Sequence, residues 1–151
     1  MDKPTLFLQR VFGDQNRAER WCVIVLRLML GVAFLNGIAS RFRLYGKNVG
    51  YGNYANYVKY AGEVNSFMPA WAIPFLANAA TVAEFGFGLL LVLGWLTRWA
   101  AYGSALLLAM FGTAMAISFG LVSPLDYSVF TGCAGALVVA MYEEKRAAER
   151  Q

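Results

Sequence analysis

The chain has 151 residues, enough for one domain, of which 59% are hydrophobic and 15% charged, with a net charge of +4. Its mean hydropathy is +0.49, and a soluble domain of this size would need far more polar surface to cover its core, so we expect a membrane protein. The sequence has no histidine, which excludes His-ligated haem, His-containing zinc or copper sites and a histidine general base. No metal site is expected, and the net charge indicates membrane orientation rather than nucleic-acid binding.

The two cysteines, Cys22 and Cys133, do not form a C-x-x-C motif. Two cysteines are too few for a disulfide framework, so we interpret both as small apolar core residues.

The first part of the chain predicts a cytoplasmic segment followed by a membrane span. Residues 1–20 are polar and charged with a few apolar positions at helical spacing, which favours a helix lying on the membrane surface. Residues 21–39 are apolar and close to the ~20 residues that cross a bilayer. Arg27 interrupts this span.

The long loop that follows, residues 44–68, is rich in Tyr, Asn and Gly and suits the membrane interface. It predicts a short interfacial helix with Asn53 as its cap. The residues expected on one face of this helix are Tyr54, Tyr57, Val58, Ala61 and Met68.

Three further spans follow. The second is predicted over 70–93, with Pro69 and Pro74 in its first turns and Gly94 at its end. The third is predicted over 98–119, capped by Thr97 and closed by Gly120. The fourth is predicted over 124–142, with Ser123 as cap and Pro124 in the first helical position, before a cytoplasmic tail over 143–151.

The predicted fold is therefore an all-α membrane protein, a bundle of four transmembrane helices over 21–142 with a short interfacial helix in the first loop. Lys and Arg outside the spans set its orientation, because they concentrate on the cytoplasmic side. Eight lie on the side of the termini and four on the side of the long loop, which places both termini in the cytoplasm. The two sets are Lys3, Arg10, Arg17, Arg20, Arg98, Lys145, Arg146 and Arg150, against Arg41, Arg43, Lys47 and Lys59.

Arg27 and Glu84 are the two charges well inside predicted spans. Each would cost ~2.5–3.5 kcal/mol against lipid, so both should face the bundle interior. Counting residues from the cytoplasmic ends puts them within reach of each other. We expect an ion pair that locks the first two helices; the alternative is the polar floor of a ligand pocket.

Further polar residues inside the spans are Asn36, Asn78 and Thr81. A contact between Asn36 and Asn78 would satisfy both amides and hold the first two helices together. A ligand cavity is the alternative, lined by glycines and large apolar side chains. Its expected walls are Gly31, Phe34, Trp71, Phe85, Phe87 and Gly88, with Gly86 nearby. The argument against a cavity is that membrane helices often pack directly against each other at such glycines and leave no space for a ligand.

Two segments resemble the DoxX family of small four-helix membrane proteins. One is LRLMLGVAFLNG over residues 26–37, an Arg followed by Gly, Phe and Gly. The other is AEFGFGLLLVLGWLTR over 83–98, an acid, a Gly-rich apolar run and Thr-Arg; SPLDYS over 123–128 also fits. The resemblance extends over residues 21–142. It departs after the first helix, where many members have His or Lys and this chain has Asn36, Ser40, Arg41 and Arg43.

The resemblance implies a membrane subunit more than a reaction, because function does not follow from fold alone. Some members are subunits of thiosulfate:quinone oxidoreductase or quinol oxidase systems, and others are partners in oxidative-stress complexes. We expect a subunit or scaffold of the bacterial cytoplasmic membrane without independent catalytic activity, associated with a redox partner. A quinone or lipid ligand and a homo-oligomer stay open, as do two alternatives: a quinone-linked oxidoreductase and a small transporter.

Overall fold

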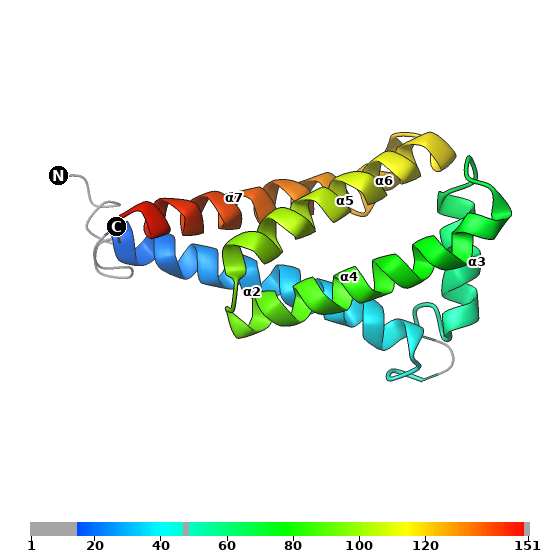
Figure 1. The fold of residues 1–151 in the computed structure, drawn as a ribbon, viewed down its shortest axis with the longest axis horizontal. Coiled ribbons are helices and arrows are strands. Elements are labelled where there is room, and N and C mark those ends of the chain that lie inside the picture. Colours follow the sequence, from blue (N-terminus) through cyan, green and yellow to red (C-terminus); the bar gives the residue numbers. More distant parts are fainter. Residues whose placement is uncertain (1–14, 47–48, 150–151) are drawn as a thin grey trace.

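The computed structural model describes residues 15–46 and 49–149, and the elements in these ranges are all helical. They are α2 (Gln15–Arg41), α3 (Tyr54–Val64), a 3-10 turn η1 (Ala70–Ala72), α4 (Ile73–Leu93), α5 (Thr97–Phe119), α6 (Val122–Asp126) and α7 (Val129–Ala148) (Figure 1). The predicted surface helix over 1–20 lies outside the described residues as far as residue 14. Residues 15–20 belong to α2, and α7 takes in much of the predicted tail.

The long helices form two antiparallel pairs, α2 with α4 and α5 with α7. The pairs meet at the end where α2 begins and α7 ends, and α3 lies across the other end (Figure 1). The main core fills the region where the pairs meet, and small side chains let the helices approach closely there. This core consists of Val23, Leu30, Phe34, Leu91, Ala100, Ala101, Ala105, Ala136, Val139 and Ala140.

Three helices of the described part are long and apolar enough to cross a membrane: Arg17–Arg41, Ala70–Leu93 and Thr97–Phe119. They correspond to the first three predicted spans. α7 is also 20 residues long, but its last turns carry the charged run that begins at Glu143. The fourth span stays a prediction.

The helix ends confirm some of the predicted signals and correct others. Gly94 and Gly120 follow α4 and α5 with φ of 74° and 84°, which favours glycine at both ends as predicted. Asn53 caps α3, its side chain accepting a hydrogen bond from the backbone N–H of Asn56. The predicted cap at Thr97 is wrong: Thr97 is already the first residue of α5, and its side chain is buried.

The predicted continuous helix from Pro124 is also wrong. The chain forms α6, breaks at Ser128 with a φ of 54°, and starts again as α7. Ser123 lies inside α6 and provides no side-chain cap. A left-handed residue interrupts the helical hydrogen-bond ladder, so the last two elements are separate.

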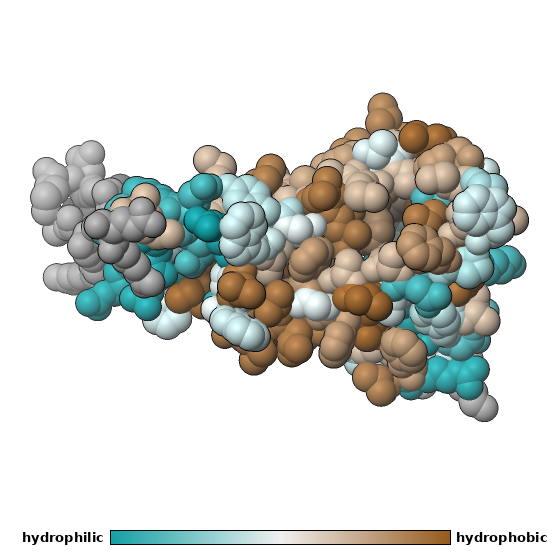
Figure 2. All heavy atoms as spheres, viewed as in Figure 1, coloured by the Kyte–Doolittle hydropathy of each residue, from teal (hydrophilic) through white to brown (hydrophobic). Residues whose placement is uncertain are grey.

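The surface carries the apolar band expected of a membrane protein. In Figure 2 hydrophobic residues cover the middle of the molecule, and hydrophilic residues gather where α2 begins and around α3. Exposed aromatic residues mark both ends, with Trp21, Trp95 and Trp99 at one end and Trp71 and Tyr127 at the other. Aromatic rings at two levels are typical of the two membrane interfaces.

Candidate functional site

The buried polar centre of the molecule is an ion pair between Arg41 and Glu84. The Nη2 of Arg41 donates to both carboxylate oxygens of Glu84, at 2.7 Å each. The side chains are only 4% and 5% exposed. Arg41 is the last residue of α2 and Glu84 lies in the middle of α4, so the pair joins these two helices.

Two more groups surround the Arg41 guanidinium. Its Nη1 donates to the Thr81 hydroxyl at 3.1 Å, and that hydroxyl in turn donates to the carbonyl of Ala77 at 2.7 Å. The ring of Tyr57 lies on the guanidinium, with its centroid 3.6 Å from Cζ. A cation over an aromatic face away from water gains ~2 kcal/mol. Among the nitrogens of the Arg41 guanidinium, Nε has no hydrogen-bond partner in the described residues, and the buried Nε of Arg27 has none either.

Three tyrosines cover this pair from the side of the long loop, and we call Tyr51, Tyr54 and Tyr57 the tyrosine cover. Their rings contact one another, with Tyr57 5.2 Å from Tyr51 and 5.8 Å from Tyr54 between centroids. Tyr54 donates its hydroxyl to Asn78 on α4 at 2.5 Å. The backbone N–H of Tyr51 donates to the Ser40 hydroxyl at 2.8 Å. The cover therefore binds α3 both to the end of α2 and to α4.

Burial makes the covering phenols hard to ionise. It raises the pKa of Tyr51 and of Tyr57 to about 12, although the nearby positive charge of Arg41 opposes the rise. Both phenols therefore stay neutral at physiological pH and can serve as hydrogen-bond donors.

Arg27 does not pair with Glu84, so the predicted pair is wrong. Its guanidinium lies against Gly94, where a side-chain carbon would overlap it. The prediction assumed that the first span begins, at Trp21, at the same depth at which the second span ends, at Gly94. In the structure it is Arg27 that lies beside Gly94. That shift of six residues is about 9 Å along a helix, and it moves Arg27 away from Glu84.

The expected contact between Asn36 and Asn78 is also absent. Asn78 bonds to Tyr54, whereas Asn36 is exposed on the side of α2 that faces away from the core. Thr81 is part of the ion-pair site. Of the predicted polar residues, the structure brings together only Glu84 and Thr81.

The first two spans close on each other at the predicted glycines. A Cβ added to Gly31 would lie 2.9 Å from the carbonyl oxygen of Gly88, and both glycines are buried. No room for a ligand is left between them. The helices therefore close directly on these glycines, the alternative to a ligand cavity that the sequence left open. The expected wall residues are dispersed: Phe34 lies in the core, whereas Trp71 and Phe85 are 82% and 51% exposed. Phe87 packs on Gly103 of α5, and a side-chain carbon added to Gly86 would meet no atom within 4 Å.

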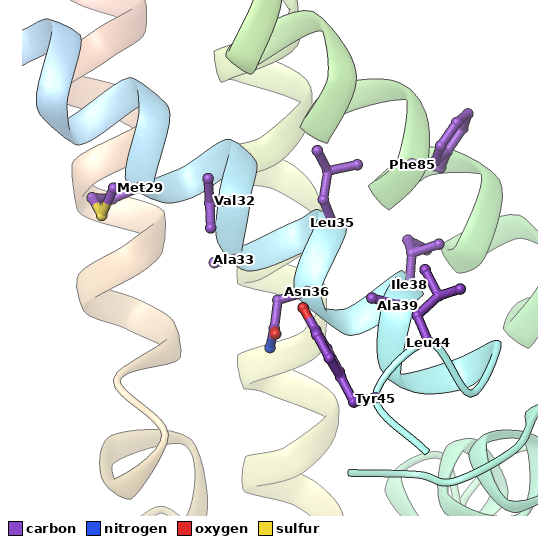
Figure 3. Close-up of a pocket in the computed structure, with 10 residues that line it drawn as sticks. All are labelled: Met29, Val32, Ala33, Leu35, Asn36, Ile38, Ala39, Leu44, Tyr45 and Phe85. Atoms are coloured by element: carbon purple, nitrogen blue, oxygen red, sulfur yellow. The ribbon is translucent and has the colours of Figure 1, made fainter. Parts of the chain in front are cut away.

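An open groove of about 590 Å³ lies on the outer surface of α2. Figure 3 shows its lining: the exposed side of α2, the turn that follows it, and Phe85 of α4. Asn36 is the polar side chain of α2 in this lining. The lining residues are Met29, Val32, Ala33, Leu35, Asn36, Ile38, Ala39, Leu44, Tyr45 and Phe85.

Sequence reasoning missed Arg41 because it assigned this residue to the loop. The signal that could have found it is spacing: Phe34, Gly37 and Arg41 follow one another at steps of three and four, on the inward face of a helix longer than predicted. In the described ranges, no three His, Cys, Asp or Glu side chains gather closely enough to hold a metal ion.

Apolar helices that pack around a buried ion pair define a helical membrane protein. The DoxX family model matches residues 22–119, which include the ion pair, most of the first apolar span and all of the other two. The chain belongs to the DoxX family. A search of curated proteins and a search of solved structures found no match.

Proposed function

We propose that the chain crosses the bacterial cytoplasmic membrane four times, with both termini in the cytoplasm. α7 supports this topology because it runs along the apolar helix α5. The Cys133 thiol of α7 donates to the carbonyl of Ala105 at 3.2 Å, and nearer the end of α7 Glu144 accepts a hydrogen bond from Tyr102. A helix that follows α5 over this length occupies the same depth of the membrane.

We further propose that the chain is a non-catalytic subunit, a scaffold that associates with a redox partner. The observation that carries this proposal is the Arg41–Glu84 pair. The two charges bind each other and Tyr57 covers the guanidinium of Arg41, so the pair serves to hold α2, α3 and α4 together. A reacting group would need access to a substrate, and these groups are closed off. A quinone or a lipid is the small molecule that this apolar protein would bind.

The test is purification from native membranes in mild detergent, followed by native mass spectrometry and a quinone-reduction assay. We expect a fixed ratio of this chain to a redox protein, and quinone reduction only when both are present. The control is Val82→Ala, which changes an exposed side chain of α4 (73% exposed) and should leave the complex intact.

Quinone reduction by the purified chain alone would overturn the scaffold proposal and favour a quinone-linked oxidoreductase. A chain purified in its native state without a redox protein would also contradict it.

A further inference from the structure

One side of α2 carries a stripe of exposed residues opposite the core. We call Val25, Met29, Val32 and Asn36 the α2 seam. Its three apolar side chains are 54%, 57% and 50% exposed, and Asn36 is exposed too. They follow one another at steps of four, three and four, the spacing with which one helix packs against a second along a left-handed seam.

Asn36 differs from the four other asparagines whose side chains the structure describes. Asn53, Asn56, Asn65 and Asn78 each hydrogen-bond within the chain through their side chains. The Asn36 amide has no such bond to any described residue. A free carboxamide on a lipid-facing surface loses the hydrogen bonds it would make in water, which is costly.

Asn36 also lies deep in the membrane. The contact between Gly31 and Gly88 sets the antiparallel register of α2 and α4, and it puts Asn36 within about two residues of the level of Phe85 on α4. Phe85 is twelve residues from the start of α4 and eight from its end, so about 18 Å and about 12 Å along the helix. This level is near the middle of the apolar layer, which keeps the amide away from water and from phospholipid headgroups.

We propose that a second copy of the chain packs against the α2 seam about a two-fold axis, with the two Asn36 amides hydrogen-bonded to each other. Copies with the same membrane orientation bring their α2 helices together in parallel, so each seam residue meets its own counterpart at the axis. A carboxamide offers both a donor and an acceptor and is complementary to itself. A single Asn in an apolar seam is known to set register and a two-stranded state.

The groove beside the seam fits this occupant. Ala33 keeps its floor low, and Leu44, Tyr45 and Phe85 line it together with the side of α2 (Figure 3). Side chains from the second α2 can fill this space while the amides meet. An acyl chain could fill the space but would leave the amide without a partner. The proposal is independent of the redox partner.

Cysteine cross-linking in native membranes tests the geometry. Met29→Cys and Val32→Cys are placed singly in a chain with Cys22→Ala and Cys133→Ala. We expect both to form disulfide-linked dimers on oxidation. The matched control is Leu106→Cys, which is 64% exposed on α5 and away from the seam. It should form no disulfide-linked dimer, and equal cross-linking at Leu106 and Val32 would overturn the proposal.

The role of the amide is tested by Asn36→Leu and Asn36→Gln. We expect Asn36→Leu to weaken dimerisation about tenfold, the scale of one interhelical hydrogen bond in lipid, and Asn36→Gln to preserve it. Energy transfer between labelled copies in vesicles measures the dimer fraction. Because Asn36 faces away from the core, the thermal unfolding of both variants should match that of the parent.

An unchanged dimer fraction in Asn36→Leu would contradict the proposal. So would a monomeric parent that carries a quinone or lipid lost in Asn36→Leu, a result that would assign the amide to a small molecule.

Discussion

Arg41 illustrates how an arginine is held inside a membrane protein. Glu84 balances its charge and accepts two hydrogen bonds, and Thr81 accepts a third. The Tyr57 ring closes the remaining face. Removing one member therefore affects all the others.

Arg41→Met should strongly destabilise the fold because it leaves the Glu84 carboxylate buried and unpaired. Loss of one partner of a buried pair costs about 3–5 kcal/mol, and adding Glu84→Met should recover part of that loss. Reversible unfolding in detergent micelles would measure it. The control is the cycle of Arg27→Met with Glu84→Met, whose effects should add. Coupling of Arg27 and additivity of Arg41 would show that the pair is assigned to the wrong arginine.

Gly94→Ala and Gly120→Ala separate a steric clash from backbone strain. Both glycines have a positive φ, so alanine costs about 1 kcal/mol or more at either position. At Gly94 the new methyl group would also overlap Arg27, whereas at Gly120 it meets no atom within 4 Å. The guanidinium is the end of a flexible side chain and can shift, so we expect only a modestly larger loss of thermal stability for Gly94→Ala. Arg27→Ala should reduce its cost to that of Gly120→Ala, and a failure to do so would rule out the clash.

At the level of elements, α3 is fixed by its tyrosines, and their ionisation should loosen it. The folded-state pKa of Tyr51 and Tyr57, about 12, lies above the ordinary value of 10.0. The folded chain therefore holds these protons more tightly, and the free energy of unfolding should fall between about pH 10 and pH 12. Absorbance at 295 nm should show two phenols that ionise at a higher pH than an ordinary tyrosine in the folded chain and at the ordinary pH after unfolding. Tyr57→Phe should remove one of them; an unchanged titration would mean that Tyr57 is not covered.

The contact between α2 and α4 depends on which glycine faces the neighbouring helix. Gly88→Ala would put its methyl group 3.2 Å from the carbonyl oxygen of Gly31, so α2 and α4 would have to move apart by a few tenths of an ångström. Gly86→Ala meets nothing within 4 Å and should be neutral or stabilise the helix by up to ~1 kcal/mol. Thermal unfolding of the two variants should thus move in different directions. Equal losses would show that the glycines do not differ in packing.

Hydropathy and glycine positions were sufficient to predict the three apolar spans and the ends of α4 and α5. They could not predict the axial offset of α2 against α4, which depends on how Gly31 and Gly88 meet in space. This offset decides that Arg41, rather than Arg27, reaches Glu84. The break at Ser128 was missed because serine seldom adopts a left-handed conformation without tertiary support.

For the whole molecule, the proposed topology of four crossings would place the start of α2 and the end of α7 on one side. Single cysteines at Glu19 and Glu149, in the chain without Cys22 and Cys133, should react with a membrane-impermeant maleimide only after the membrane is opened. A cysteine at Lys59 of α3 should react in intact cells. Labelling of the Glu149→Cys variant in intact cells would show instead that the chain crosses the membrane three times.

The position of the ion pair also bears on how the chain enters the membrane during synthesis. Arg41 lies at the end of the first span, where its long side chain can still reach the interface. Glu84 lies in the middle of the second span, where a lone charge is costly. Since α2 is synthesised first, the arginine is in place before the glutamate arrives. We expect the second span to insert efficiently only after the first, because Arg41 of α2 is then available to pair with the Glu84 carboxylate of α4.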